Sequence, residues 1–283
     1  MSVVVTGATG HLGRLIVANL LAGGLPADQI VATGRRTERL ADLDVRSAAA
    51  DYGDAAALAA AFEGAETVVL VSGSEPGVRV AQHGAVIDAA KAAGVRRLVY
   101  TSAPHADTSA LALAPDHKAT EELVRASGLA WTIVRNNWYT ENYVGALEQA
   151  RTTGVLLSST GDGRVASASR DDYAAGAAAV ALGEGHEGRV YELSGDVAWS
   201  FDELADAMAT ILGTPVVNKQ VSFDEHRAIL VDAGLDEGTA GFVATLDADI
   251  RRGDLADATP DLRTLIGRPT TPLVDGLRAA AGQ

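Results

Sequence analysis

The segment Val3–Gly13, with the sequence VVVTGATGHLG, constrains the fold of this chain more than any other segment. Its β-branched start predicts a buried strand, and an amphipathic helical pattern follows directly after the last glycine. Gly7 allows a sharp turn, Gly10 lets a ligand approach the backbone, and Gly13 lets the helix lie close to the strand. The segment therefore predicts a strand–turn–helix unit whose free N–H groups face a pyrophosphate.

We expect the residues of this turn to contact that ligand. They are Gly7, Thr9, Gly10, His11, Leu12 and Gly13. The alternative is an ordinary strand-to-helix turn with incidental glycines. The position of the turn, after a buried strand and before a helix, favours the binding site.

Short β-rich runs alternate with longer helical patterns in the first half of the chain. The expected strands are 3–5, 30–33, 67–71, 98–101 and 131–134, and the expected helices are 12–23, 54–62, 79–93 and 115–127. This alternation predicts an α/β fold, a Rossmann-like doubly wound parallel sheet with helices on both faces. Ligands of such folds bind beyond the carboxyl ends of the strands.

The alternation breaks up after about residue 140. The later elements expected are a helix at 170–183, a short strand at 189–193, a capping box of Ser200 and Glu203, and helices at 222–234, 238–251 and 271–281. We therefore expect a nucleotide-binding domain at 1–140. Residues 141–283 are expected to contribute to the sheet and to form a small, mainly helical substrate lobe.

Composition excludes several classes of function. The net charge of −14 produces an overall field that repels nucleic acid and anionic lipid. The chain has no cysteine, which excludes disulfides, thiolate nucleophiles and thiolate metal ligands. Its six histidines lack metal-ligand spacing, so we expect no metal site. Without a signal peptide or an 18-residue apolar stretch, a cytoplasmic protein with no membrane contact is expected.

The end of the second strand indicates which dinucleotide binds. Sites selective for NAD place an acidic side chain there, whereas a guanidinium accommodates the 2′-phosphate of NADP. This chain has Arg35 and Arg36 at that point. Cations at a helix start oppose the helix dipole, which disfavours a purely structural role for them. The sequence therefore predicts NADPH as cofactor, with Arg35 as the phosphate contact.

Two further loops are expected to contact the coenzyme. Asp51 and Tyr52 follow a strand, and Asp51 is placed to contact adenine or adjacent backbone. Asp54 is instead expected to cap the next helix. The residues Ser72, Gly73 and Ser74 end another strand and are expected beside the adenosine and pyrophosphate half, with a plain turn as the alternative.

Blocks of sequence along the whole chain carry a resemblance to a known family. They are TGATGHLG at 6–13, ADY at 50–52, YTS at 100–102, SGL at 127–129 and RNNWYTEN at 135–142, with shorter blocks at 105–109, 161–163, 185–188, 190–193 and 265–267. On these blocks the chain resembles the NmrA-like group of atypical short-chain dehydrogenases/reductases. The resemblance implies a Rossmann-like fold, NADPH as hydride donor, no flavin, and quinones as acceptors.

The same resemblance implies cofactor contacts at the 6–13 turn, Arg35, residues 72–74 and the loop from Asn136 to Asn142. Thr101 is a further expected cofactor contact, because it begins one of the loops at the carboxyl ends of the strands. Two of the loop residues are the adjacent amides Asn136 and Asn137. Because these amides follow a strand, they also lie where ligands bind in such folds. An ordinary loop is the alternative for them.

One departure from the wider superfamily bears on catalysis. Aligned on the SGL block, Leu113 stands where the tyrosine of a YxxxK pair would be, and His117 stands where its lysine would be. The chain therefore lacks the Tyr–Lys proton relay. Hydride addition to a quinone yields a weakly basic phenolate rather than an alkoxide, so positioning can replace acid catalysis.

The remaining candidates concern the acceptor. His117 and Asn142 are the candidate catalytic donors, and Trp138, Tyr139 and Asn142 are the candidate substrate-binding residues. Core packing is the alternative for the two aromatics, and a structural histidine is the alternative for His117. Glu121 and its neighbour are expected on a solvated helix face, with an i,i+4 arginine as partner.

Three functions fit these expectations. The first is an NADPH-dependent quinone reductase that acts on a small-molecule quinone. The second is a reductase of another conjugated acceptor, such as a triphenylmethane dye. The third is an NADP(H)-sensing regulatory protein without turnover. A homodimer is compatible with the sequence, and direct contact with nucleic acid is not expected.

Overall fold

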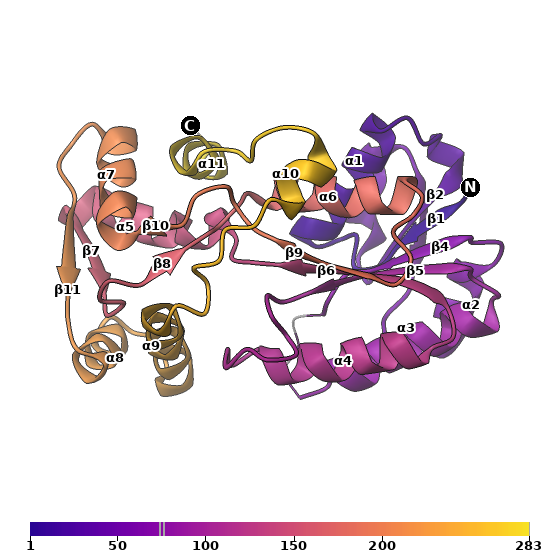
Figure 1. Ribbon diagram of the computed structural model, residues 1–283, viewed down its shortest axis with the longest axis horizontal. Helices are drawn as coiled ribbons and strands as arrows, with labels where there is room; N and C mark the ends of the chain where they lie inside the picture. The colour runs from indigo at the N-terminus through magenta and orange to yellow at the C-terminus, as the bar shows by residue number, and fades with distance from the viewer. Residues whose placement is uncertain (74, 76, 283) are drawn as a thin grey trace.

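The computed structural model of the chain describes residues 1–73, 75 and 77–282, and its centre is one parallel sheet of seven strands (Figure 1). The strands are β1 (Val3–Val5), β2 (Ile30–Gly34), β3 (Arg46–Ala49), β4 (Thr67–Leu70), β5 (Arg97–Ser102), β6 (Ala130–Asn136) and β9 (Arg189–Leu193). Their order is β3-β2-β1-β4-β5-β6-β9, and every neighbouring pair is parallel. The direction of winding reverses between β1 and β4, which confirms the expected Rossmann-like fold.

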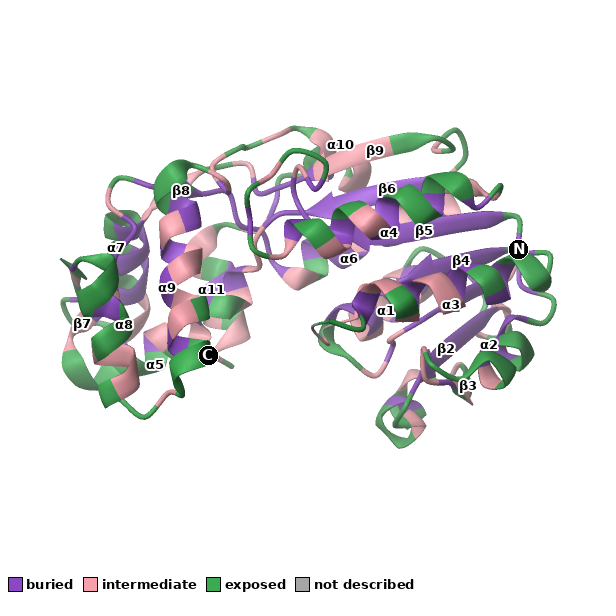
Figure 2. Cartoon of the chain, turned by 90° about the horizontal axis from the view of Figure 1, so that it is seen from below, coloured by how far each residue is buried: buried purple, intermediate pink, exposed green. Residues whose placement is uncertain are grey.

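Helices cover both faces of the sheet, as Figure 1 shows. The helices α1 (His11–Ala22) and α6 (Arg170–Leu182) lie on one face, and α2 (Ala55–Phe62), α3 (Arg79–Ala92) and α4 (Ala114–Ala126) lie on the other. Alternate residues of β1 enter the two resulting cores: Val3 and Val5 pack on the α1 side, and Val4 packs on the α2 side. The central strand β1 is therefore apolar throughout. Figure 2 shows that its neighbours β4 and β5 are likewise buried.

The second half of the chain supplies both a lobe and parts of the sheet domain. The lobe holds helices α5 (Val144–Thr153), α7 (Phe201–Leu212), α8 (Phe223–Asp232), α9 (Glu237–Arg252) and α11 (Leu273–Ala280), and strands β7 (Val155–Ser158), β8 (Arg164–Val165), β10 (Trp199–Ser200) and β11 (Val217–Gln220). Its strands pair as two small sheets, and it has an apolar core of its own. Both α6 and β9 return to the large sheet, where α10 (Asp261–Ile266) packs against them. Three short 3-10 helices, η1 (Ala27–Gln29), η2 (Thr37–Leu43) and η3 (Thr140–Tyr143), complete the fold.

Most expected elements agree with the structure to within a few residues. Asp54 caps α2 by accepting a hydrogen bond from the Ala57 amide at 3.0 Å, and Ser200 and Glu203 form the expected capping box. The strand β3 lies outside the expected strand ranges. It is short, mostly exposed and at the edge of the sheet, so it lacks a run of apolar residues. None of the described helices is both long and apolar enough to cross a bilayer.

Candidate functional site

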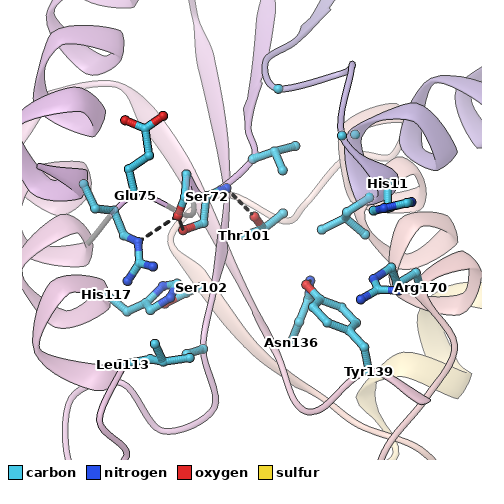
Figure 3. A pocket seen from close by; sticks show the side chains of 18 of the residues that line it. His11, Ser72, Glu75, Thr101, Ser102, Leu113, His117, Asn136, Tyr139 and Arg170 are labelled. Carbon is cyan, nitrogen blue, oxygen red and sulfur yellow. Dashed lines mark hydrogen bonds between the residues drawn. The ribbon is translucent and has the colours of Figure 1, made fainter. Parts of the chain in front are cut away.

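A cavity of about 600 Å³ lies at the carboxyl ends of the strands (Figure 3). Loops after six strands, β1 to β6, contribute to its wall, together with residues from α1, α3, α4 and α6. The cavity thus lies at the reversal point between β1 and β4, where ligands of doubly wound sheets bind. The structure brings all but one of the predicted site residues to its wall, and Ser74 lies outside the described residues.

The glycine turn forms one side of this cavity. Gly7 has a φ of +60°, a left-handed conformation that favours glycine. A Cβ at Gly13 would lie 2.5 Å from the carbonyl oxygen of Gly7, so α1 packs directly onto the turn. Gly10 is the N-cap residue of α1, and no side chain bonds to the free amides at this helix start. The first turn of α1 also holds no acidic residue. The N-terminal amides of α1 are therefore available to an anion.

Tyr52 forms hydrogen bonds beside the glycine turn. Its hydroxyl donates to the carbonyl oxygen of Val71 at 2.6 Å and lies 2.8 Å from the hydroxyl of Thr6. Burial raises the pKa of this phenol above its ordinary value, so it remains protonated. Tyr52 lines the cavity, but its hydroxyl is already engaged by the protein.

The charged residues of the cavity wall are mainly basic, although the chain is acidic. Five arginines and two carboxylates line it: Arg35, Arg36, Arg39, Arg79 and Arg170 with Asp51 and Glu75. Because the whole chain carries a net charge of −14, this concentration of positive charge is local. Such a wall attracts a ligand with several negative charges.

Arg35 lies at the mouth of the cavity beside two carboxylates. Its Nη1 lies 2.7 Å from Oε1 of Glu75, and its Nε lies 3.7 Å from Oδ2 of Asp51. The Arg35 side chain is 66% exposed, so its guanidinium is accessible to an incoming phosphate. The Glu75 carboxylate thus pairs with this guanidinium.

Three side chains hold the loop after β4 in place. Thr101 Oγ1 accepts a hydrogen bond from the Ser72 amide at 3.0 Å, and His83 Nε2 accepts from the Gly73 amide at 2.9 Å. Arg79 Nε donates to the Gly73 carbonyl at 2.7 Å. The sequence analysis did not identify His83 or Arg79, because both lie within a helical pattern with no motif to mark them. Their role comes from packing between α3 and the strand ends.

His117 lies on the opposite wall from Arg170 in Figure 3. Its ring is 7% exposed, and its Nδ1 is 2.9 Å from the hydroxyl of Tyr100. Burial, aided by the nearby charge of Arg79, lowers the pKa of His117 to about 4. The ring is therefore uncharged near neutral pH, so it can offer an N–H hydrogen bond but not an imidazolium acid. Leu113 lies next to it at the start of α4.

The expectation that Glu121 lies on a solvated face is wrong. Glu121 is fully buried, and Arg135 binds both of its oxygens at 2.8 and 2.7 Å. Ser102 donates to it at 2.7 Å, and the expected i,i+4 partner Arg125 donates at 2.9 Å. Burial alone would raise the pKa of Glu121, but the hydrogen bonds from Arg135 and Ser102 lower it below its ordinary value. Long-range pairing with β6 therefore buries a residue that local pattern assigned to the surface.

The two adjacent amides after β6 differ in their environment. Asn137 uses its side chain within the protein: Nδ2 donates to the carbonyl oxygens of Leu255 and Asp257, and Oδ1 accepts from the Trp138 amide at 2.7 Å. This anchors the loop after β6 to the segment after α9. Asn136 is buried, and its Oδ1 has no hydrogen-bond partner among the described residues. Asn136 is therefore the one of the pair that can receive a ligand donor.

The aromatic residues of this loop face the cavity and also pack against the protein. Trp138 borders the lobe core, and Tyr139 packs edge-on against Tyr173 with ring centroids 5.4 Å apart. The guanidinium of Arg170 lies 5.0 Å from the ring centre of Tyr139 and donates to Asn142 Oδ1 at 2.9 Å. The binding and core-packing interpretations thus both describe these aromatics. Asn142 is exposed, and its oxygen is engaged by Arg170.

Metal ligation is not evident at this site. Within residues 1–73, 75 and 77–282, no group of three or more His, Asp or Glu side chains is arranged to hold a metal ion. Apart from the carboxylates of Asp51 and Glu75, the polar groups of the cavity are amides, hydroxyls, imidazoles and guanidinia, which suit an organic anion better than a cation.

Comparison with known proteins identifies the family of the chain. A family model described as NAD(P)H-binding matches residues 7–183. The chain belongs to this family. It is 44% identical to quinone oxidoreductase 2 of Escherichia coli over 97% of each protein.

Solved structures agree with this assignment. The E. coli NADPH-dependent quinone oxidoreductase in complex with NADPH has a TM-score of 0.93 and 43% identity, covering 98% of this chain and 99% of that one. The Citrobacter sp. triphenylmethane reductase in complex with NADP(H) has a TM-score of 0.93 and 36% identity, covering 99% of this chain and 100% of that one. The expected family resemblance is confirmed.

Proposed function

We propose that this protein is an NADPH-dependent quinone reductase that transfers hydride from NADPH directly to a quinone, without flavin. The observation that carries the proposal is the basic cavity at the glycine turn, with Arg35 at the end of β2, in a chain that is acidic overall. The E. coli relative, 44% identical over nearly the whole chain, is named a quinone oxidoreductase and has been solved with NADPH. The likeness supports the same cofactor and acceptor class here.

The residues of the cavity fit NADPH along its length. The uncapped start of α1 and the close packing at Gly13 suit the pyrophosphate. The Arg35 guanidinium suits the 2′-phosphate. Asn136 Oδ1 is buried and has no partner within the described part of the chain, so it favours a donor from a ligand, which the carboxamide of nicotinamide can supply. Thr101 serves the coenzyme indirectly, because its hydroxyl positions the amide of Ser72.

When bound, NADPH supplies a hydride, which carries two electrons and one hydrogen. The quinone that accepts it is reduced to a hydroquinone anion, so negative charge develops on the acceptor oxygen. The neutral His117 ring then donates a hydrogen bond to that oxygen, and the Arg79 guanidinium adds positive charge nearby. Water supplies the proton that completes the hydroquinone, because a neutral imidazole is too weak an acid to release one.

The apolar part of the wall orients the acceptor ring. Leu111, Leu113 and Trp138 line the cavity, and Tyr139 lines it on the side of Arg170. These side chains suit a flat ring and exclude water from the reacting atoms. Leu113 occupies the position of the missing tyrosine, so the site depends on positioning rather than on proton relay.

Other properties are proposed on sequence grounds. The small-molecule quinone is the expected partner, and direct nucleic-acid contact is disfavoured by the net charge. A homodimer and a cytoplasmic location remain predictions. Light scattering of the purified protein tests the first, and fractionation of the source cells tests the second.

Purified protein provides the test of function. We expect loss of the nicotinamide absorbance band when a benzoquinone or naphthoquinone is added to enzyme and NADPH, and slower loss with NADH. A triphenylmethane dye in parallel tests the second acceptor class, which the Citrobacter structure favours. Calorimetric binding of NADPH without any acceptor-dependent oxidation would contradict the proposal and indicate a regulatory protein.

A further inference from the structure

Tyr100 reaches the site from behind the cavity wall. It is on β5, its side chain is fully buried, and it does not line the cavity. Its hydroxyl nevertheless lies 2.9 Å from Nδ1 of His117, which does line the cavity. Tyr100 can therefore act on an acceptor through the His117 ring.

The direction of this hydrogen bond follows from the placement of protons. A neutral imidazole carries one proton, on either Nδ1 or Nε2. If Nδ1 carried it, the Tyr100 oxygen would be the acceptor, and the buried phenolic proton would need another acceptor. Nδ1 of His117 lies 2.9 Å from that hydroxyl, and the hydroxyls of Thr120 and Ser72 are its other polar neighbours. Of these three possible acceptors the imidazole nitrogen is the most basic, so it is the preferred partner of the phenolic proton. The arrangement that satisfies both groups has Tyr100 donating to Nδ1, with the ring proton on Nε2.

The neighbouring His83 also has its tautomer set by a hydrogen-bond partner, which in this case is a backbone amide. His83 Nε2 accepts from the Gly73 amide at 2.9 Å, so the His83 ring proton is on Nδ1. That nitrogen lies 3.0 Å from the hydroxyl of Thr120, which donates onward to the Asp116 carbonyl at 2.9 Å. With Tyr100 donating to His117, the two buried histidines would hold opposite tautomers, each selected by the partner at the other nitrogen.

We propose that Tyr100 is a positioning residue that holds neutral His117 in the tautomer whose Nε2–H points into the cavity toward the acceptor oxygen. The inference rests on the proposed function and deepens it. No described residue forms a hydrogen bond with Nε2 of His117. This nitrogen is also absent from the buried side-chain atoms that lack a hydrogen-bond partner, so it is accessible from outside the protein. The opposite tautomer would present a lone pair to an oxygen that becomes negative, which would oppose the reaction.

This arrangement accounts for the loss of the superfamily tyrosine. With Leu113 at the start of α4, this position has no phenol. Tyr100 provides a phenol from β5 instead. Its target is the imidazole rather than the substrate. No proton has to leave the tyrosine, because its hydrogen bond only fixes where the imidazole proton is. Burial raises the pKa of Tyr100, which keeps that phenolic proton in place.

The first test measures the tautomer directly and does not depend on activity. Nuclear magnetic resonance of the histidine ring nitrogens, in coenzyme-free protein at neutral pH, should show His117 protonated at Nε2 only. In Tyr100→Phe we expect a mixture of the two tautomers. Protonation at Nδ1 in the unsubstituted protein, or an unchanged spectrum in Tyr100→Phe, would overturn the proposal.

The second test compares this substitution with a matched control. Tyr191 forms a similar pair with His186, with its hydroxyl 2.7 Å from Nδ1, but neither residue lines the cavity. We expect Tyr100→Phe to lower kcat with a naphthoquinone about tenfold, with the Kd for NADPH unchanged, and Tyr191→Phe to leave kcat unchanged. Equal effects of the two substitutions would refute a specific role for Tyr100.

A double-substitution cycle separates positioning from general structural support. We expect His117→Ala to lower kcat about a hundredfold, and Tyr100→Phe to have no further effect in that background. A further tenfold loss there would show that Tyr100 acts independently of His117. If the unsubstituted protein oxidised no NADPH with any quinone, the proposed function would fail, while the tautomer measurement would still decide the inference.

Discussion

The two ends of the cavity are built in different ways. At the phosphate end, the Arg35 side chain is 66% exposed, and α1 presents backbone amides. At the acceptor end, His117 is 7% exposed and uncharged, and Asn136 is 4% exposed. The first end presents an exposed charge and a helix terminus. The second fixes neutral hydrogen-bonding groups in place before any ligand arrives, which is the arrangement expected for stabilising charge that develops during a reaction.

The largest effect on NADPH binding should come from a side chain added at the glycine turn. A Cβ at Gly13 would lie 2.5 Å from the Gly7 carbonyl oxygen, so Gly13→Ala must separate α1 from the turn. We expect the Kd for NADPH to rise more than a hundredfold, about 3 kcal/mol of binding free energy. Gly84→Ala is the control, since its Cβ would have an ordinary contact of 3.7 Å in α3. Unchanged calorimetric affinity in Gly13→Ala would show that the turn does not hold the pyrophosphate.

The acceptor end should make the fold sensitive to acid. The pKa of His117 is lowered to about 4 and that of His83 to about 3, from the ordinary value of 6.5, and burial is the main cause for both. Below pH 6.5 the unfolded chain binds more protons than the folded chain, so the free energy of unfolding falls as the pH falls toward 4. For His117 this loss is on the order of 3 kcal/mol.

Urea unfolding between pH 7 and pH 4 measures that loss. His117→Gln removes the titrating group, so its free energy of unfolding should vary less with pH than that of the unsubstituted protein. His11→Gln is the control, because His11 is an exposed histidine on the wall of the same cavity. The same pH dependence in all three proteins would contradict a neutral, buried ring at the acceptor end.

The coenzyme preference should depend on the exposed arginine. Arg35→Ala removes a charge-assisted contact to the 2′-phosphate, and we expect NADPH binding to weaken by about 2 kcal/mol. NADH lacks that phosphate, so its affinity should change little. Arg96→Ala is a matched control, because Arg96 is 68% exposed and also pairs with a glutamate. Equal weakening of both coenzymes would refute the assignment of Arg35.

The smallest effect should come from replacing Glu75, whose carboxylate pairs with Arg35. Glu75→Gln removes an anion 2.7 Å from the guanidinium, and we expect two- to threefold tighter NADPH binding, about 0.5 kcal/mol. The change should be absent with NADH and absent in an Arg35→Ala background. Weaker NADPH binding in Glu75→Gln would mean that the carboxylate supports the site rather than competing with the phosphate.

The phosphate end was largely predictable from sequence because its determinants are local. The turn of Gly7 and Gly13, the cap at Asp54 and the arginine after β2 each depend on neighbours within a few residues. Local rules on turns, caps and helix dipoles therefore apply to them directly. The expected order of strands and helices followed from the same local periodicity.

The acceptor end was only partly predictable because long-range contacts define it. The i,i+4 bond between Arg125 and Glu121 was foreseen, but the burial of Glu121 by Arg135 was not. The different environments of Asn136 and Asn137 could not be foreseen either, since residues more than a hundred positions further along the chain bind the Asn137 side chain. Nothing in the pattern around Tyr100 signals that its hydroxyl meets His117, because β5 and α4 pair only in the folded protein.

The buried fork between Arg135 and Glu121 has a mechanical consequence. Glu121 follows His117 by one helical turn on the same face of α4, and Arg135 also binds Glu192 of β9 at 2.7 Å. Any sliding or tilting of α4 would pull this buried carboxylate away from the Arg135 guanidinium, which is costly in the interior. The ion pair thereby fixes the position of α4. The His117 ring should then stay in the same place in the cavity wall when coenzyme and acceptor bind and leave.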